Sequence, residues 1–136
     1  MKWHEQALLF LEKAREDACV LEKLAADKEV ADAIIGFHAQ QAVEKMLKAV
    51  LTKKKIAFPW HHDLESLLDL LRKNDVQFPA TWEQIADLTP FGAEYRYGRL
   101  PAEINESEPF DRQWALRIIR QMRLWTEKHV QTPSEF

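Results

Sequence analysis

The chain has 136 residues, enough for one domain with a single hydrophobic core, and only 3 of them are glycines. Its 19 lysines and arginines stand against 22 aspartates and glutamates, and this formal net charge of −3 excludes a strongly basic nucleic-acid-binding protein. Any contact with a nucleic acid must therefore come from a local basic patch.

The single cysteine and the lack of long apolar runs restrict the class of protein further. Cys19 alone can form neither an intrachain disulfide nor a thiol-rich zinc site, which fits a reducing compartment. No apolar run approaches the roughly 20 residues of a membrane span, and residues 1–6 lack the apolar region of a signal peptide. We therefore expect a cytoplasmic protein without a membrane segment.

Two long helices are expected in the first half of the chain. Apolar residues recur at steps of three and four from Trp3 to Leu24, the pattern of an amphipathic helix. Asp27 is a plausible break or cap before a second helix, which is expected from about Val30 to Lys53. The basic run at 53–55 suits the end of that helix, because the helix dipole favours cations there.

Shorter elements follow after a loop at residues 56–60. Asp63 or the preceding histidines can start a third helix, which ends at Asn74-Asp75. Thr81 is a good N-cap for a fourth helix that begins at Trp82. Between Gly92 and Pro109 apolar periodicity is weak and glycine and proline recur, so the longest loop is expected there.

A last helix is expected from Glu108-Pro109, because proline is tolerated in a first turn. Its inward stripe is Phe110, Trp114, Ile118, Met122 and Trp125. Residues 131–136 are expected to form a flexible tail, so that 1–130 make up one domain. Long helices with mostly short connections predict an all-α fold, an antiparallel up-and-down bundle of four to five helices.

The expected second helix carries two stripes. The apolar stripe, which should face the core, consists of Ala39, Ala42, Val43, Met46, Ala49 and Val50. A polar stripe at steps of three and four consists of His38, Gln41, Lys45, Lys48 and Thr52. This polar stripe is the candidate working surface; the alternative is a solvated face on which Glu44 and Lys48 form an ordinary pair worth about 0.2–0.5 kcal/mol.

The expected loop contains a second candidate, the run Tyr95-Arg96-Tyr97-Gly98-Arg99. Guanidinium groups bind phosphate and tyrosine rings stack on bases, so this run is the best phosphate-binding candidate in the sequence. The alternative is a tyrosine pair that packs the loop, with Arg96 paired to Glu94 or Glu103. The last helix could extend a basic surface through Arg112, Arg117, Arg120 and Arg123.

The histidines do not predict a metal site. His61 and His62 could join Asp63 and His38 as ligands, but two adjacent side chains cannot easily chelate one ion. The simpler interpretation is that Asp63 or a histidine caps the third helix. We therefore predict neither a metal nor another cofactor.

The stretch from Gly36 to Leu51, GFHAQQAVEKMLKAVL, resembles the second helix of the HEPN domain family. His62-Asp63-Leu64, followed by Leu67-Leu68, and Tyr95-Arg96-Tyr97 fall where that family has its other motifs. The resemblance spans most of the chain. It implies a homodimeric helical bundle that binds a nucleotide or RNA, in which His62 orients the loop or a polar cleft. It also implies a partner, since members of the family are often encoded beside a minimal nucleotidyltransferase as a toxin and antitoxin.

The ribonucleases of that family carry an arginine followed, after four to six residues, by a histidine near the start of the last helix. Neither Arg96 nor Arg99 has a histidine at these distances. Arg123 and His129 fit the spacing, but they lie late in the last helix and about 120° apart around its axis. We interpret that match as accidental.

Three functions are thus open. The preferred one is a nucleotide- or RNA-binding module, a homodimer that acts with a nucleotidyltransferase-type partner. The alternatives are a metal-independent ribonuclease that uses Arg96 with His38 or His62, and a purely structural dimerisation protein. The predicted ligand-binding residues are His38, Gln41, Lys45, Lys48, His62, Tyr95, Arg96, Tyr97 and Arg99. No catalytic residue is assigned.

The aromatic content of the sequence also predicts a homodimer. It contains 5 tryptophans and 7 phenylalanines, many for one small bundle. Some of this aromatic surface, such as Trp60, Trp82 or Trp125, could therefore be left for a partner.

Nuclease activity is expected to be weak or absent. The histidine expected after Arg96 is missing, and a general acid or base typically contributes about 10²- to 10⁴-fold to the rate. Incubation of a labelled RNA with the pure protein and a metal chelator checks this. Robust cleavage that is lost in His38→Ala or His62→Ala would support the ribonuclease instead.

Overall fold

The computed structural model describes residues 2–59, 63–92 and 110–131. In these ranges it contains α1 (Trp3–Leu24), α2 (Asp32–Lys53), α3 (Leu64–Lys73), the 3-10 helix η1 (Ala80–Gly92) and α4 (Arg112–Gln131), and no strand. The predicted all-α helical bundle is confirmed.

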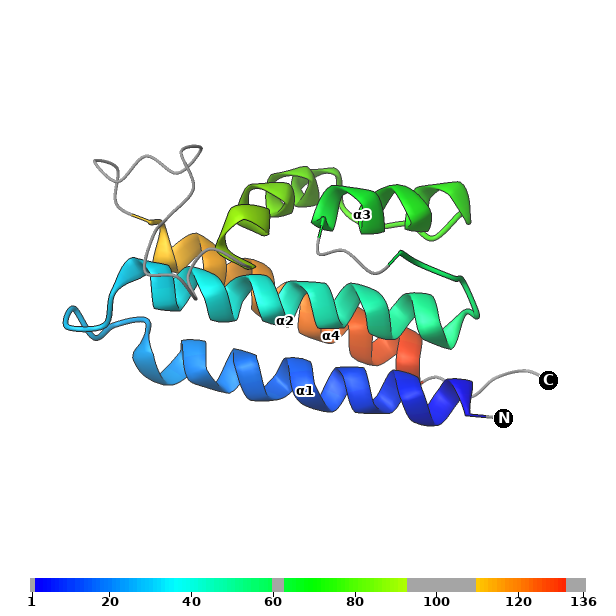
Figure 1. Ribbon diagram of the computed structural model, residues 1–136, viewed down its shortest axis with the longest axis horizontal. Helices are drawn as coiled ribbons and strands as arrows, with labels where there is room; N and C mark the ends of the chain where they lie inside the picture. The colour runs from blue at the N-terminus through cyan, green and yellow to red at the C-terminus, as the bar shows by residue number, and fades with distance from the viewer. Residues whose placement is uncertain (1, 60–62, 93–109, 132–136) are drawn as a thin grey trace.

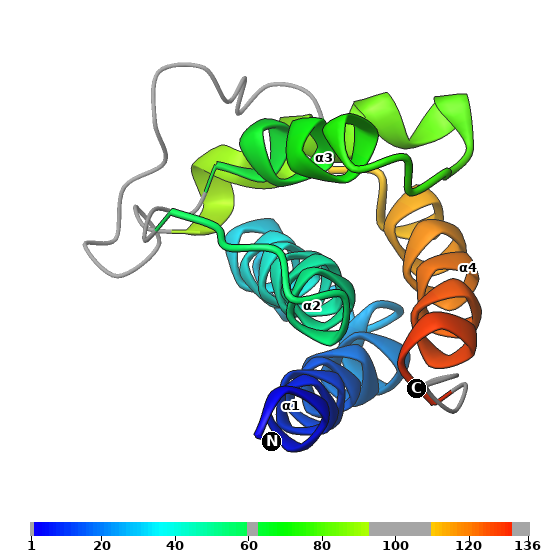
Figure 2. The same ribbon diagram turned by 90° about the vertical axis from the view of Figure 1, so that its right-hand side faces the viewer.

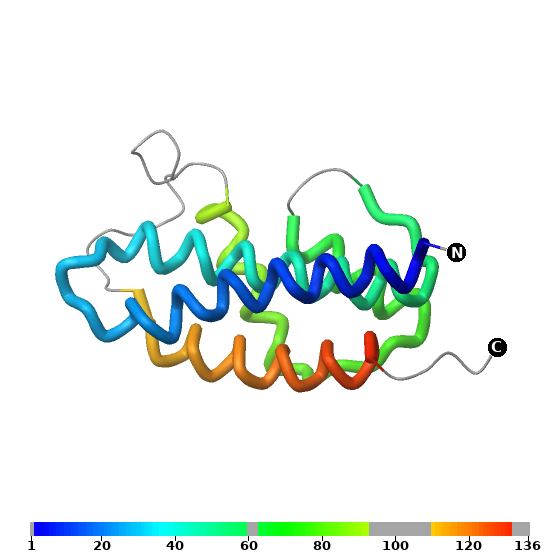
Figure 3. Tube along the Cα trace, turned by 90° about the horizontal axis from the view of Figure 1, so that it is seen from below, coloured from blue at the N-terminus to red at the C-terminus, as the bar shows by residue number. Residues whose placement is uncertain are grey.

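Three long helices run alongside one another, and the shorter α3 and η1 lie above α2 in Figure 1. α1 and α2 form an antiparallel hairpin, and α4 runs antiparallel to α1 (Figure 3). The end view in Figure 2 shows α2 between α1 on one side and the layer of α3 and η1 on the other. α2 contacts each of the other four elements, so it is the centre of the bundle.

Most helix boundaries follow the sequence closely, but α4 begins at Arg112 and not at Glu108-Pro109, so Phe110 lies before the helix. Asp111 caps α4, because its side chain accepts a hydrogen bond from the Trp114 N–H at 2.9 Å.

α1 begins and ends where its periodicity does, and α2 begins at Asp32, two residues after the expected start. Asp63 caps α3, because its side chain accepts hydrogen bonds from the Glu65 N–H at 3.1 Å and the Ser66 hydroxyl at 2.8 Å. α4 includes Gln131, which the sequence assigned to the tail; residues 132–136 and the predicted loop at 93–109 lie outside the described residues.

The fourth helix differs from the prediction in type and start. It is a 3-10 helix, and Thr81 lies inside its first turn instead of capping it. The Trp82 N–H donates to the Pro79 carbonyl at 3.0 Å, so the first turn starts at Pro79 and already includes Thr81. Pro90 lies within the element and has no N–H to donate.

The core contains the whole predicted apolar stripe of α2, since all six of its residues are fully buried. Trp82 is also buried, stacked on Phe78 with ring centres 6.0 Å apart and edge-on to Trp125 at 5.1 Å. Trp125 is partly buried and donates its indole N–H to the Gln77 carbonyl. The suggestion that Trp82 is left for a partner is therefore wrong, because it fills the space between η1 and α4; Trp60 lies outside the described residues.

Two glycines let the end of η1 approach α2 closely. A Cβ on Gly36 would lie 2.2 Å from the Phe91 ring, and one on Gly92 would lie 2.7 Å from the Gln40 side chain. Any larger residue at either position would collide with a buried neighbour. The close approach fixes the end of η1 over the first half of α2.

Candidate functional site

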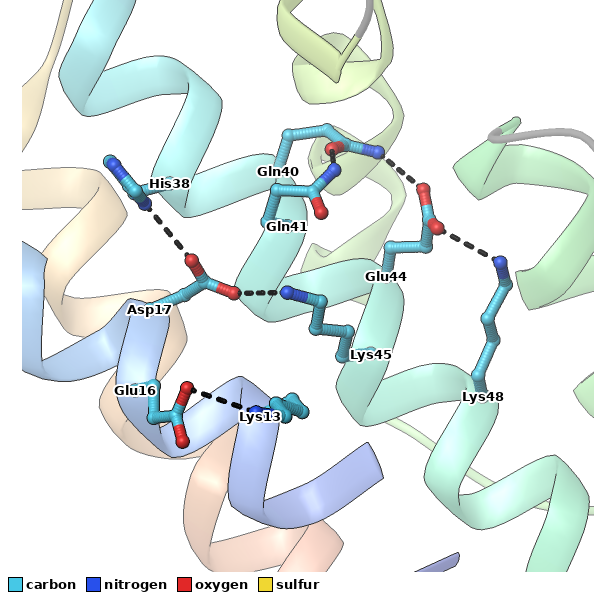
Figure 4. A network of polar contacts seen from close by, with 9 residues as sticks. All are labelled: Lys13, Glu16, Asp17, His38, Gln40, Gln41, Glu44, Lys45 and Lys48. Carbon is cyan, nitrogen blue, oxygen red and sulfur yellow. Dashed lines mark hydrogen bonds and ion pairs between the residues drawn. The ribbon is translucent and has the colours of Figure 1, made fainter. Parts of the chain in front are cut away.

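Polar side chains on the middle turns of α2 form two clusters (Figure 4). The outer cluster consists of Asp17, His38 and Lys45. The inner cluster consists of Gln40, Gln41, Glu44 and Lys48.

The outer cluster is organised by one carboxylate from α1. Asp17 Oδ1 lies 2.9 Å from His38 Nδ1, and Asp17 Oδ2 accepts a hydrogen bond from Lys45 Nζ at 2.7 Å. The Asp17 side chain is only 12% exposed, whereas those of His38 and Lys45 are 24% and 27% exposed. A largely buried anion therefore holds two donors that are open to solvent.

The position of the proton on His38 follows from this contact. An ionised carboxylate can only accept hydrogen bonds, so Nδ1 of His38 carries the proton that faces Asp17. The second ring nitrogen, Nε2, points away from Asp17 (Figure 4). Nε2 accepts a hydrogen bond when the ring is neutral and donates one when the ring is protonated.

The inner cluster is a buried chain of hydrogen bonds. Gln41 donates to Gln40 at 2.7 Å, Gln40 donates to Glu44 at 2.7 Å, and Lys48 donates to the other oxygen of Glu44 at 2.9 Å. Gln40, Glu44 and Lys48 are buried. The Lys48 ammonium also lies 5.5 Å from the centre of the Phe58 ring. Glu44 and Lys48 thus form the i,i+4 pair of the alternative interpretation, but the pair is buried, so its placement on a solvated face is wrong.

A regular spacing produces the inner cluster. Gln40, Glu44 and Lys48 are four residues apart, so they form one row along α2. Their side chains point toward the ribbons of α3 and η1 in Figure 4. Because the row is covered, an anion can reach Lys48 only by competing with Glu44.

The structure brings together part of the predicted ligand-binding set. His38 and Lys45 meet at Asp17, while Gln41 and Lys48 belong to the inner cluster. The other predicted residues, His62, Tyr95, Arg96, Tyr97 and Arg99, lie outside the described residues.

Sequence reasoning missed Asp17 and Gln40. Asp17 is a carboxylate between Ala14 and Leu21 on the apolar side of α1, and a charge on an apolar stripe is the signal that could have identified it. Gln40 precedes Glu44 by one helical turn, and the same spacing that identified the pair of Glu44 and Lys48 could have added it.

Both ends of the segment 93–109 are anchored at the first half of α2. On one side Gly92 meets Gln40. On the other, the Phe110 N–H donates to Asp32 at 3.1 Å, and the Phe110 ring lies 5.1 Å from that of Phe91. Arg112 binds Asp32 through Nε at 2.9 Å, which holds the start of α4 in the same place.

Most arginines of α4 are paired instead of forming an open basic surface. Arg120 donates to both oxygens of Glu22, at 2.6 and 2.7 Å, and this hydrogen bonding lowers the pKa of Glu22. Burial raises the pKa of Glu127, but hydrogen bonds from Arg15 and Arg123 outweigh it and lower the pKa overall. Arg112 is held by Asp32, as above. Arg117 is exposed.

His129 is packed against the bundle. Its ring lies 4.8 Å from that of Trp125, and burial, helped by the charges of Lys54 and Lys128, lowers its pKa. Arg123, its supposed partner, instead contacts Glu127 at 3.4 Å. The described contacts therefore give Arg123 and His129 separate surroundings.

The described ranges contain neither a cluster of metal ligands nor a helix that could span a membrane. There, no three histidine, cysteine, aspartate or glutamate side chains gather as metal ligands would. None of the described helices has both the length and the apolar character needed to cross a membrane.

The comparisons with known proteins give one match. The family model for the HEPN domain matches residues 3–129, nearly the whole chain. No curated protein and no solved structure matches the chain.

Proposed function

The chain belongs to the HEPN domain family, and from this premise we propose that it is a nucleotide- or RNA-binding module. The outer cluster is the observation that supports the proposal best. There His38 and Lys45 offer donors to solvent from one patch, and Asp17 fixes both. Donors held in advance lose less entropy when they bind an anion.

Further cations are needed to attract a phosphate. With a neutral imidazole, the charges of Lys45 and Asp17 cancel, so the outer cluster has no net charge. Gly92 is anchored beside Gln40, and four extended residues span at most about 14 Å. Arg96 is therefore within chain reach of the polar side chains of α2. We propose that Arg96 and Arg99, with the flanking tyrosines and His62, complete the site.

The double variant Arg96→Ala, Lys45→Ala tests this site. Binding of a labelled nucleotide or short RNA should weaken roughly tenfold or more, since hydrogen bonds to charged groups contribute about 1.5–3 kcal/mol each before screening by solvent. Wild-type affinity should also fall with salt, with a slope of about 0.7 per phosphate neutralised on a single strand. Fluorescence anisotropy at two salt concentrations measures both effects.

The control removes the same charge elsewhere. Arg117 and Lys2 are both exposed, and Lys2 lies at the start of α1, 15 residues before Asp17. The double variant Arg117→Ala, Lys2→Ala should therefore bind as the wild type does. Equal affinity in both double variants would remove the proposed site.

We also propose that the protein is a homodimer. Trp3, Leu9 and Leu124 are large apolar side chains exposed on α1 and α4, and such surface is available to a second copy. Sedimentation at micromolar concentration should give twice the mass of one chain. A monomer at that concentration would contradict the dimer.

The proposed partner is a minimal nucleotidyltransferase, with which the protein would form a toxin–antitoxin-like pair in the cytoplasm. This part of the proposal rests on family membership alone. Purification of the native protein from its source, with identification of what co-elutes, tests it. Elution of the protein by itself would contradict a stable pair.

A metal-independent ribonuclease is the second candidate. One observation favours it: Asp17 orients the partly exposed His38 ring so that Nε2 points away from the carboxylate. A carboxylate that orients an imidazole is a common arrangement for a general base. The metal-free cleavage assay with His38→Ala decides between the two functions.

A further inference from the structure

The side chains of the outer cluster have N–H groups that their contacts with Asp17 do not use. Both oxygens of Asp17 are occupied, one by His38 and one by Lys45. A lysine ammonium has three N–H groups, so Lys45 retains two beyond the one given to Asp17. His38 gains one more at Nε2 when its ring is protonated. Three N–H groups can therefore face solvent from a single patch.

We propose that Asp17 is a positioning residue that presents His38 Nε2 and Lys45 Nζ as a clamp for a phosphate monoester, and that binding is coupled to protonation of His38. The inference rests on the proposed function and names the ligand group of the same site. A monoester has three terminal oxygens that accept hydrogen bonds strongly, matching the three donors, whereas a diester has two. The terminal phosphate of a nucleotide and the phosphorylated end of an RNA both carry this group.

Coupling to a proton follows from the charges of the cluster. Asp17 and Lys45 cancel, so a neutral His38 leaves no net charge and a protonated His38 leaves one positive charge. An anion at Nε2 favours the protonated ring. By linkage, binding must then take up a proton and become tighter as the pH falls.

The charged groups around His38 are few. From α1 it faces Asp17; the adjacent Glu16 pairs with Lys13, one turn away, at 3.6 Å. From α2 it shares Asp17 with Lys45. Asp17 is the charged group that the His38 ring binds in the described part of the chain. The ring of Phe37 lies edge-on at 5.2 Å and limits rotation of the imidazole.

The chain contains a matched control for the clamp. His4 and Lys53 also pair, with Nζ of Lys53 2.8 Å from Nδ1 of His4, but the contact is exposed and has no carboxylate between the two groups. There the ring nitrogen must accept from the ammonium, so protonation of His4 breaks the contact. The same residue types should therefore fail to bind phosphate without Asp17.

Titration calorimetry with adenosine 5′-monophosphate and with a 5′-phosphorylated oligonucleotide tests the clamp. It is run at pH 8 and 6.5, in buffers with different heats of ionisation. The wild type should bind more tightly at pH 6.5 and take up at most about one proton per ligand. His38→Gln should bind about tenfold more weakly at pH 6.5 and lose its own part of the pH dependence. His4→Gln should match the wild type.

Control ligands show whether the phosphate group is what binds and whether it comes from a nucleotide or from an RNA end. The phosphate itself titrates in this range, but identically for every variant, so the difference between variants reports His38. Adenosine and the 5′-hydroxyl oligonucleotide should bind much more weakly than their phosphorylated forms. Preference for the nucleotide or for the oligonucleotide tells which source the site takes, and either one supports the clamp.

The variant Asp17→Asn tests whether Asp17 positions the two donors for the ligand or competes with the ligand for them. It makes the cluster more positive, yet we expect several-fold weaker binding. His38 and Lys45 contact different oxygens of Asp17, and the amide replaces one of these oxygens by an NH2 donor. Tighter binding would show that Asp17 competes with the ligand and would overturn the proposal. Nitrogen chemical shifts of the histidine rings give a second test in the wild type: phosphate should shift Nε2 of His38, and equal shifts of His4 and His38 would also overturn the clamp.

The experiments give different results if only the clamp is wrong and if the proposed function is wrong too. If RNA binding depends on Arg96 and Lys45 while His38→Gln keeps the wild-type pH profile, the clamp alone is wrong. If no phosphate-containing probe binds at any pH, the proposed function is wrong as well.

Discussion

Replacement of Trp82 by alanine is expected to lower the free energy of unfolding by about 3–5 kcal/mol, the usual cost of emptying a buried aromatic site. Trp82 is 1% exposed and joins Phe78 of the preceding loop to Trp125 of α4. Its removal opens a cavity where η1 meets the rest of the bundle. Thermal unfolding followed by circular dichroism should show a fall in Tm of more than about 10 °C.

Two control variants show whether the loss of stability comes from the burial of Trp82 or from its indole group. Trp3→Ala removes the same side chain where it is 39% exposed, and should cost less than about 1 kcal/mol. Trp82→Phe should cost much less than Trp82→Ala, because the indole N–H of Trp82 is buried without a hydrogen-bond partner among the described residues. Equal losses in Trp3→Ala and Trp82→Ala would contradict the role given to Trp82.

Replacement of Lys48 by methionine is expected to lower the free energy of unfolding by about 2–4 kcal/mol. The side chains of Lys48 and Glu44 are 11% and 6% exposed, so the change removes the counter-ion of a buried carboxylate. Methionine has nearly the same length, and packing against Phe58 is retained. Chemical denaturation measures the loss.

A double variant tests whether the loss in Lys48→Met comes from the unpaired charge of Glu44. Lys48→Met, Glu44→Gln should recover at least half of the loss, because the glutamine is neutral and can still accept from Gln40. Lys13→Met removes a lysine from an exposed pair, whose side chains are 53% and 61% exposed, and should cost less than about 0.5 kcal/mol. A loss in Lys48→Met no larger than in Lys13→Met would mean that the pair is not buried in solution.

The variants of Lys48 and Lys45 also assign different roles to two residues of one predicted stripe. Lys48 holds the inner cluster together, so its loss should affect stability first. Lys45 is partly exposed at the outer cluster, so its loss should affect phosphate binding first. Unfolding and binding measured on the same variants can therefore assign each lysine to stability or to recognition.

The sequence by itself determined the extents of α1 and α2 and which stripe of α2 is buried. Periodicity at 3.6 residues depends only on which side chains are apolar, so it gave the extent of α1 and the buried stripe of α2. The cap at Asp63 was equally readable, because it acts within one turn of its own helix. The HEPN resemblance, carried by the motif in α2, is confirmed over nearly the whole chain.

Only the tertiary structure decided the partners of the polar side chains. His38 and Lys45 share Asp17, which lies 21 and 28 residues away in the sequence, and no local pattern encodes that contact. Burial of Glu44 with Lys48 depends on what covers α2, so a pair that looks solvated on a helical wheel lies inside the protein. Trp82 and η1 were misjudged for the same reason: the type of a short helix and the burial of a ring are set by neighbours that are distant in sequence.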